Sequence, residues 1–586
     1  MPDPALILER FKNHLNEIVA KEHLYPYMDT NAEDFDIDML IDILVANYID
    51  VHFFIDNVTW DGILAYLNEF PQVGRDGGRR LVVAPCSPLF EPILEKLAAH
   101  FPNVAFIDIN RAGFRLGDKT IQLPDQVVPA PDDVCLIVTR NTEAAASYEK
   151  KFGKDNCVNL LHLFIQRYRQ ELAPKSQVLL DQINTAEKPI LFASPRPLGT
   201  MASSVHQMNR DGYTTFWLGS EEIKHEKQSG FNTPKVEDIP FRDFAIGGLI
   251  DLLHIFSNMC QGKVLYHFET IYPPAWDFSR VAICYAATLA MIRTIKETRP
   301  PESTGRLVLH MYDAIKPGVK NYQAGEACGP LYKQVMTEAD AVIFSSYTED
   351  FGDFVQNALA RPLKRAHCHR YQVLPSKRRP RLTDGYHVAL ISVLLEEYWE
   401  PSRLGLLPYL RNVIDQGIYI HYYVHEISPT KIVEFRESLP EHQRHLFQVH
   451  KPIHDLVELA NELSQYHVGW SLYNMQIFSD MVSHVTDQFT RDAMDLFTPT
   501  TLPSVIWTCA AAGLPIVCNR SMRGVVDMLP QGLTIPLHLS ELVSLRRILE
   551  ETDWDAVDRI PLDDLDISRQ IHLLYDFLDG LTEEAP

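Results

Sequence analysis

One stretch near the end of the chain, residues 500–529, constrains the fold more than any other. Its apolar, alanine-rich segment, 504–512, suits a short buried helix that ends at Gly513. A compact β-forming run, 514–518, comes next, and a turn at 519–524 leads into a run that opens another helix. Helix, glycine and strand in this order are typical of an αβ junction in a parallel sheet, so the sequence predicts an α/β fold.

The same pattern repeats along most of the 586 residues. Short apolar runs separated by helical patterns predict parallel strands that are covered on both faces. We expect strands at 80–84, 104–108, 134–139, 190–193, 214–218, 263–267, 307–311, 341–344, 387–393, 419–424, 447–450 and 467–471. The predicted organisation is a helical and small α/β domain (1–158), a helical connector (159–186), a first α/β lobe (187–360), a basic linker (361–384) and a second α/β lobe (385–586).

Composition excludes several functional classes. The formal net charge of -23 argues against a nucleic-acid binder, because phosphate affinity needs a Lys/Arg surface. Nine cysteines without a CxxC pair indicate reduced, buried thiols and a cytoplasmic protein. The sequence shows no signal-peptide core and no run of about 18 apolar residues, so we predict no transmembrane segment.

Several motifs resemble one enzyme family. LPS at 502–504, AAGLPIV at 511–517 and RG at 523–524 resemble the nucleotide-sugar half of GT-B glycosyltransferases, especially the retaining group 4 family. FQVHKPIHDL at 447–456 and EADAVIFSS at 338–346 resemble further segments of that family. The resemblance covers roughly residues 187–550 and implies two Rossmann-like lobes of a GT-B fold, here preceded by an additional N-terminal α/β domain.

The resemblance also implies donor-binding residues in the second lobe. The backbone around Lys451 and Pro452 would meet the donor base, and Thr508 stands where the family has the Glu that holds the ribose. A hydroxyl cannot supply the charge-assisted hydrogen bond of a carboxylate, so this is a serious departure. The remaining candidates are Arg403, Arg523 and Gly524 for the diphosphate and Asp527 for a sugar hydroxyl.

In the first lobe, candidate residues follow the predicted strands. His310 and Asp313, at the end of the LVLHM strand, are candidate catalytic residues together with Asp527 of the second lobe. Arg196, Gly199 and Thr200 follow the strand at 190–193, where the family has a loop that faces the acceptor and the phosphates. The alternative interpretation of His310 is a histidine that packs in the core. The alternative interpretation of Arg196, Gly199 and Thr200 is an ordinary βα turn.

Three other features permit both a functional and a structural interpretation. Cys86 follows a strand and is a candidate nucleophile, although no base is identifiable nearby. The basic run at 361–381 is either a solvated linker or a set of cations bordering a nucleotide site. Its His367–Cys368–His369 triplet lacks a second ligand pair, so we predict no metal site.

The sequence therefore predicts a cytoplasmic glycosyltransferase of the hexosyltransferase type, retaining and independent of metal. Its co-substrate is a nucleotide-sugar, with no other cofactor, and its acceptor is a saccharide, a lipid-linked group or a protein. Oligomerisation stays open, and no nucleic-acid partner is expected. The alternative is a GT-B-like binding or assembly module that has lost catalysis, which Thr508 and the missing cation at 392–394 favour.

Overall fold

The structure, a computed structural model, describes most of the chain. No helix among the described residues is both long and apolar enough to cross a bilayer. The described ranges are 4–28, 31–33, 35–46, 60–70, 72–74, 78–87, 90–139, 142–160, 173–194, 199–219, 238–267, 281–311, 324–345, 348–359, 362–367, 378–392, 406–424, 429–451, 453, 455–473 and 488–583.

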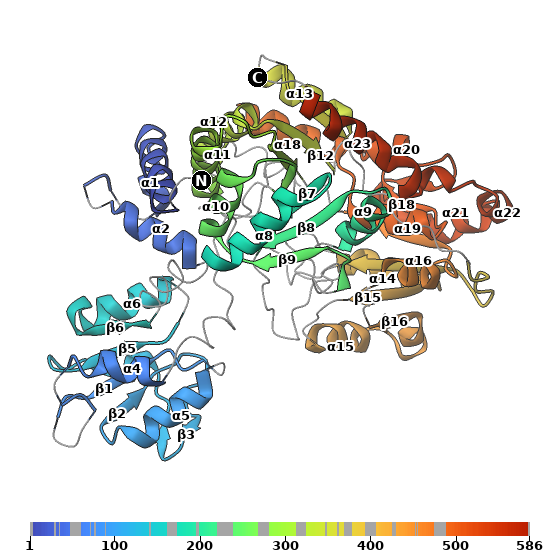
Figure 1. The fold of residues 1–586 in the computed structure, drawn as a ribbon. Helices are drawn as coiled ribbons and strands as arrows, with labels where there is room; N and C mark the ends of the chain where they lie inside the picture. The colour runs from blue at the N-terminus through green and yellow to red at the C-terminus, as the bar shows by residue number, and fades with distance from the viewer. Residues whose placement is uncertain are drawn as a thin grey trace.

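Three parallel sheets organise the described residues (Figure 1). The small domain has the order β2-β1-β5-β6, the first lobe β13-β12-β11-β10-β7-β8-β9 and the second lobe β16-β15-β14-β17-β18-β19. Their bounds are β1 Leu81–Ala84, β2 Val104–Phe106, β5 Val134–Ile137, β6 Cys157–Asn159, β7 Pro189–Ala193, β8 Thr214–Gly219, β9 Asp243–Ile246, β10 Lys263–His267, β11 Arg306–Met311, β12 Ala341–Phe344, β13 Arg365–His367, β14 His387–Ser392, β15 Tyr419–Val424, β16 Phe447–His450, β17 Val468–Ser471, β18 Ile516–Asn519 and β19 Thr534–Leu537. A short hairpin, β3 Arg115–Leu116 and β4 Lys119–Thr120, adjoins the small sheet.

The order of the strands identifies the architecture. Numbered within its own lobe, the second sheet runs 3-2-1-4-5-6, and the first lobe repeats this order with a seventh strand at its edge. This is the doubly wound Rossmann order, in which both faces of a parallel sheet are covered by crossover helices. The predicted α/β fold, with two Rossmann-like lobes preceded by a small α/β domain, is confirmed.

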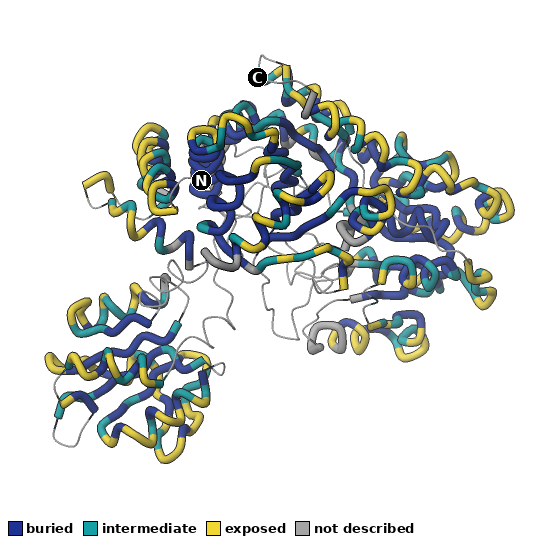
Figure 2. Tube along the Cα trace, in the orientation of Figure 1, coloured by how far each residue is buried: buried dark blue, intermediate teal, exposed yellow. Residues whose placement is uncertain are grey.

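Helices enclose the sheets, and Figure 2 shows the strands and the inward helix faces as buried. The α-helices are α1 Pro4–Lys21, α2 Ile37–Ala46, α4 Trp60–Leu67, α5 Glu91–His100, α6 Thr142–Phe152, α8 Ala173–Thr185, α9 Gly199–Arg210, α10 Leu249–Asn258, α11 Val281–Thr298, α12 Ala324–Glu338, α13 Glu349–Leu359, α14 Leu406–Asp415, α15 Pro429–Ser438, α16 Leu456–Leu463, α18 Gln488–Thr500, α19 Ser504–Ala511, α20 Arg523–Met528, α21 Leu545–Glu551, α22 Trp554–Asp558 and α23 Ile567–Glu583.

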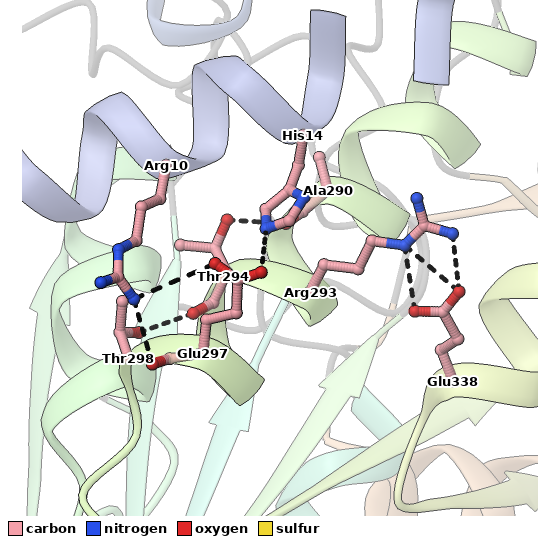
Figure 3. A network of polar contacts seen from close by, with 8 residues as sticks. All are labelled: Arg10, His14, Ala290, Arg293, Thr294, Glu297, Thr298 and Glu338. Carbon is pink, nitrogen blue, oxygen red and sulfur yellow. Dashed lines mark hydrogen bonds and ion pairs between the residues drawn. The ribbon is translucent and has the colours of Figure 1, made fainter. Parts of the chain in front are cut away.

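The N-terminal helix α1 packs on α11 of the first lobe (Figure 3). Its Arg10 Nη1 donates to the Glu297 carbonyl at 3.1 Å, and His14 Nε2 lies 3.1 Å from the Glu297 carboxylate. On the other side of α11, Arg293 pairs with Glu338 of α12 at 2.8 Å. Residues 1–158 therefore contain a segment that packs on the first lobe, while the predicted domain boundaries stay predictions.

Two helices from the end of the chain complete the first lobe. Helix α23 places apolar side chains in the same core as strands β7 and β8. Tyr575 stacks on Tyr213 with ring centroids 4.5 Å apart. Helix α18 inserts Phe489 between Phe354, stacked at 5.3 Å, and Tyr332 at 5.8 Å. The first lobe is thus built from segments at both ends of the sequence.

The predicted linker 361–384 contributes to both lobes. Residues 365–367 form strand β13, which pairs with β12 of the first lobe. Arg379 pairs with Glu462, while Arg381 lies 2.6 Å from Asp558 and 4.9 Å from the centre of the Trp554 ring. Because these arginines precede β14, they lie at the amino edge of the second sheet. The triplet at 367–369 lies mostly outside the described residues.

The close packing of β17 against α19 allows us to predict how a substitution at Gly469 changes the free energy of unfolding. A Cβ at Gly469 would meet the Cys509 side chain, with 3.0 Å to its Cβ. Gly469→Ala should therefore lower the free energy of unfolding by about 1–3 kcal/mol through overpacking. The matched control is Gly580→Ala in α23, where nothing lies within 4 Å and alanine should stabilise the helix by up to about 1 kcal/mol. Chemical denaturation checks both, and equal effects would contradict the packing argument.

Candidate functional site

The carboxyl edges of the two large sheets meet. Thr348, which follows β12, donates its N–H to the Thr500 carbonyl at 3.0 Å. Gly524, in the first turn of α20 after β18, lies against it: a Cβ there would be 2.7 Å from Thr348 Cγ2. Ligands of doubly wound sheets bind at carboxyl edges near the point where strand order reverses. That point lies between β7 and β10 in one lobe and between β14 and β17 in the other.

On the first-lobe side, the structure describes one pair of polar side chains near the carboxyl ends of the strands. His310 near the end of β11 hydrogen-bonds through Nε2 to the Ser345 hydroxyl, which follows β12 and is buried. Gly199 and Thr200 are the first residues of α9, beyond the carboxyl end of β7. Asp313 and Arg196 lie outside the described residues. The structure therefore places His310 at the correct edge, and its catalytic role stays a prediction.

On the second-lobe side, exposed cations follow two strands. Lys451 comes directly after β16, and Arg523 begins α20. Among the described residues, neither Lys451 nor Arg523 forms an ion pair. In contrast, Arg520, which follows β18, pairs with Glu541 at 2.9 Å. Asp527 is exposed on α20. Pro452 and Arg403 lie outside the described residues.

For two of the predicted donor-binding residues, Thr508 and Gly524, packing alone accounts for the residue type or limits its contact with a ligand. Thr508 lies in α19 and is only 6% exposed, among neighbours that are buried as well. A ligand contact at Thr508 would be limited to that small surface. A Cβ on Gly524 would also lie 3.1 Å from the Pro499 carbonyl and 3.2 Å from the Thr500 carbonyl, so packing alone requires a glycine there.

The interpretation of Cys86 as a nucleophile is wrong. Its side chain is fully buried, and burial raises the pKa of its thiol to about 12. Its backbone N–H donates to the buried Asp108 carboxylate at 2.9 Å, which also accepts from the N–H groups of Asn110 and Arg111. The polar residues at this strand end therefore hold a loop in place.

A chain of three histidines, two of them buried, links strands β14, β15 and β16 of the second sheet, and the sequence did not reveal it. Asp384 accepts from His387 Nε2 at 3.0 Å, His387 Nδ1 lies 2.8 Å from His421 Nε2, and His421 Nδ1 lies 3.0 Å from His450 Nε2. His387 is at the amino end of β14 and His450 at the carboxyl end of β16, next to Lys451. The imidazoles are close because the strand register places them diagonally on one face.

These histidines are neutral at physiological pH. Burial lowers the pKa of His387 and of His450, and burial with both histidine neighbours lowers that of His421 to about 3. Because the Asp384 carboxylate requires a donor, His387 carries its proton on Nε2 and accepts on Nδ1. The same logic assigns the Nε2–H tautomer to His421 and His450. The chain of hydrogen bonds therefore has one direction, toward Asp384.

No family model and no curated protein matches this sequence. Among solved structures, similarity is found to an alpha,alpha-trehalose-phosphate synthase (UDP-forming) from Burkholderia xenovorans, with 12% identity, a TM-score of 0.38 and coverage of 67% of this chain and 100% of that one. TarM gives 8% identity and a TM-score of 0.35, covering 69% of this chain and 97% of that one. The GtfA/B complex gives 9% identity and a TM-score of 0.34, covering 55% of this chain, which spans only 58% of that one.

Proposed function

We propose that this protein is a cytoplasmic glycosyltransferase that moves a sugar from a nucleotide-sugar donor to a saccharide, lipid-linked or protein acceptor. One observation carries the proposal: two doubly wound sheets, each in Rossmann order, meet at their carboxyl edges at Thr348 and Gly524. Such edges bind nucleotides, so an activated sugar and an acceptor can be brought together between two lobes.

The charge distribution agrees with an anionic donor. In a protein of net charge -23, Lys451 and Arg523 are exposed at the carboxyl edge of the second sheet. We assign Arg523 to the donor diphosphate, whose negative charge increases as the sugar leaves, and the segment around Lys451 to the nucleoside end of the donor. Arg403 would assist if it reaches the same edge, and Asp527 would orient a sugar hydroxyl. We propose His310 and Asp313 as groups of the first lobe that face the acceptor and the transferred sugar.

The proposed transfer is metal-independent and retains the anomeric configuration, as the resemblance to the group 4 family implies. Closure of the lobes would exclude water and so favour transfer over hydrolysis. No cofactor beyond the nucleotide-sugar is proposed.

Removing the two exposed cations tests the donor site. Arg523→Ala should weaken UDP binding about tenfold, because it loses one charge-assisted contact with the diphosphate worth about 1.5 kcal/mol, and Lys451→Ala should weaken it because a cation beside the anionic nucleotide is lost. Calorimetric titration with UDP, GDP, CMP and dTDP measures these affinities and also shows which nucleotide base the site prefers. Lys96→Ala, an exposed cation on α5 of the small domain, controls for net charge. Equal affinities in all three variants would contradict the assignment.

The second candidate is a binding or assembly module without catalysis. The buried Thr508 hydroxyl favours it, since the resembled family holds the donor ribose with a carboxylate at this position. Hydrolysis and transfer assays with UDP-, GDP-, CMP- and dTDP-sugars, in the presence of mixed acceptors, separate the two. Nucleotide binding without any turnover supports the module, and turnover supports the enzyme.

A further inference from the structure

Two cysteines of the small domain that are far apart in sequence lie side by side. Cys135 of β5 and Cys157 of β6 are register partners in parallel strands, so their side chains lie on the same face of the sheet. Neighbouring strands are about 4.8 Å apart, which is within the Cα separation of about 4.4–6.8 Å that a disulfide spans. The two thiols interact electrostatically, and each shifts the pKa of the other.

The two thiols differ in a way that suits thiol–disulfide exchange. Cys135 is fully buried between the sheet and α6, while Cys157 is half-buried on β6, the edge strand. Interaction with Cys135 lowers the pKa of Cys157 in spite of the nearby Glu149 carboxylate. Contact with Cys157 and burial raise the pKa of Cys135, so this thiol does not react with an external disulfide and can attack only the adjacent Cys157 sulfur. Burial raises the pKa of Cys509 and of Cys518 to about 12, so these thiols are also unreactive toward an external disulfide.

We propose that Cys157 and Cys135 form a reversible disulfide, with Cys157 the attacking and Cys135 the resolving thiol. The oxidant is a low-molecular-weight disulfide of the glutathione class. The Cys157 thiolate attacks one sulfur of this disulfide, forms a mixed disulfide and releases one glutathione thiolate. Cys135 then loses its proton and attacks the Cys157 sulfur, which forms the internal disulfide and releases the second glutathione. Two protein thiols are oxidised, and one disulfide is reduced to two thiols.

The site gives the small domain a chemistry that is independent of the proposed sugar transfer. A bond between laterally paired strands must draw their Cβ atoms from the usual strand spacing to about 3.8 Å, so the disulfide should be readily reduced. Excess reduced glutathione should therefore restore both thiols.

Oxidised glutathione, added to the reduced full-length chain under anaerobic conditions, tests the proposal. After alkylation of free thiols, peptide mass spectrometry without reductant should find Cys135 linked to Cys157. Cys260 is the internal control: it is exposed and is expected to retain a glutathione adduct. A stable glutathione adduct on Cys157 in the wild-type chain, or an unmodified Cys157 beside a modified Cys260, would overturn the proposal.

Single variants assign the two roles. In Cys135→Ser, Cys157 should accumulate as the glutathione adduct, because no thiol resolves it. In Cys157→Ser, the buried Cys135 should stay unmodified. Cys135→Ala is a second variant in case serine is not tolerated in the core, and circular dichroism confirms folding. An adduct on Cys135 in the Cys157→Ser variant would reverse the assignment.

Discussion

Acidification from about pH 8 to about pH 4 is expected to destabilise the second lobe by about 6 kcal/mol. Burial lowers the pKa of His421 from 6.5 to about 3 and that of His467 from 6.5 to about 4. The unfolded chain then binds more protons than the folded chain, so stability is complete above about pH 6.5 and is lost as the pH falls toward the folded pKa values. Each pH unit below 6.5 costs about 1.4 kcal/mol for each such histidine.

His421→Phe tests the origin of this effect. Phenylalanine keeps the stacking on Tyr466, whose ring lies 4.1 Å away, but it cannot titrate. We expect a lower stability at neutral pH, because His387 and His450 lose a hydrogen-bond partner, and a slope of stability against pH that is shallower by about 1.4 kcal/mol per unit. Urea titrations at several pH values measure the slope. His442→Gln, on an exposed histidine of the same lobe, should leave the slope unchanged.

Removal of α23 is expected to unfold the first lobe. Five side chains of this helix are each at most 6% exposed, namely Ile567, Ile571, Leu574, Leu578 and Leu581. At about 2 kcal/mol for each buried side chain, they contribute about 10 kcal/mol, which is comparable to the whole stability of a typical domain. A chain that ends at Asp566 should therefore aggregate or be degraded, as a solubility assay and limited proteolysis would show.

A point variant gives a finer measure of the same contact. Leu578→Ala, at a fully buried position, should lower the free energy of unfolding by about 3 kcal/mol. Leu573→Ala, in the same helix but 55% exposed, should change it by less than about 0.5 kcal/mol. Equal shifts in the denaturation midpoint would show that α23 does not stabilise the first lobe.

The sequence predicts the inner strands of the three parallel sheets well and misses four of their six edge strands, while the edge strands β2 and β16 are predicted. Strands 263–267, 341–344, 419–424 and 447–450 match β10, β12, β15 and β16 residue for residue. Strands β6, β9, β13 and β19 were not predicted, and all four lie at sheet edges. A central strand is covered on both faces and must be apolar throughout, whereas an edge strand tolerates polar residues, as Arg365–Ala366–His367 illustrates.

The candidate site was predictable only where it depends on strand ends. His310, Lys451 and Arg523 follow apolar runs, so their position at the carboxyl edges could be inferred. The histidine chain and the Cys135–Cys157 pair could not, because they depend on the register between strands far apart in sequence. The contact between Thr348 and Gly524 could not be predicted either, because it depends on how the two lobes pack against each other.

The position of α23 has a consequence for synthesis. The first lobe begins at about residue 187, yet the last helix, which ends at Glu583, supplies part of its core. While a ribosome makes the protein, strands β7 and β8 emerge long before this helix and keep an uncovered apolar face. The nascent first lobe should therefore depend on chaperones until α23 has left the ribosome, and chains truncated before this helix should be quickly cleared.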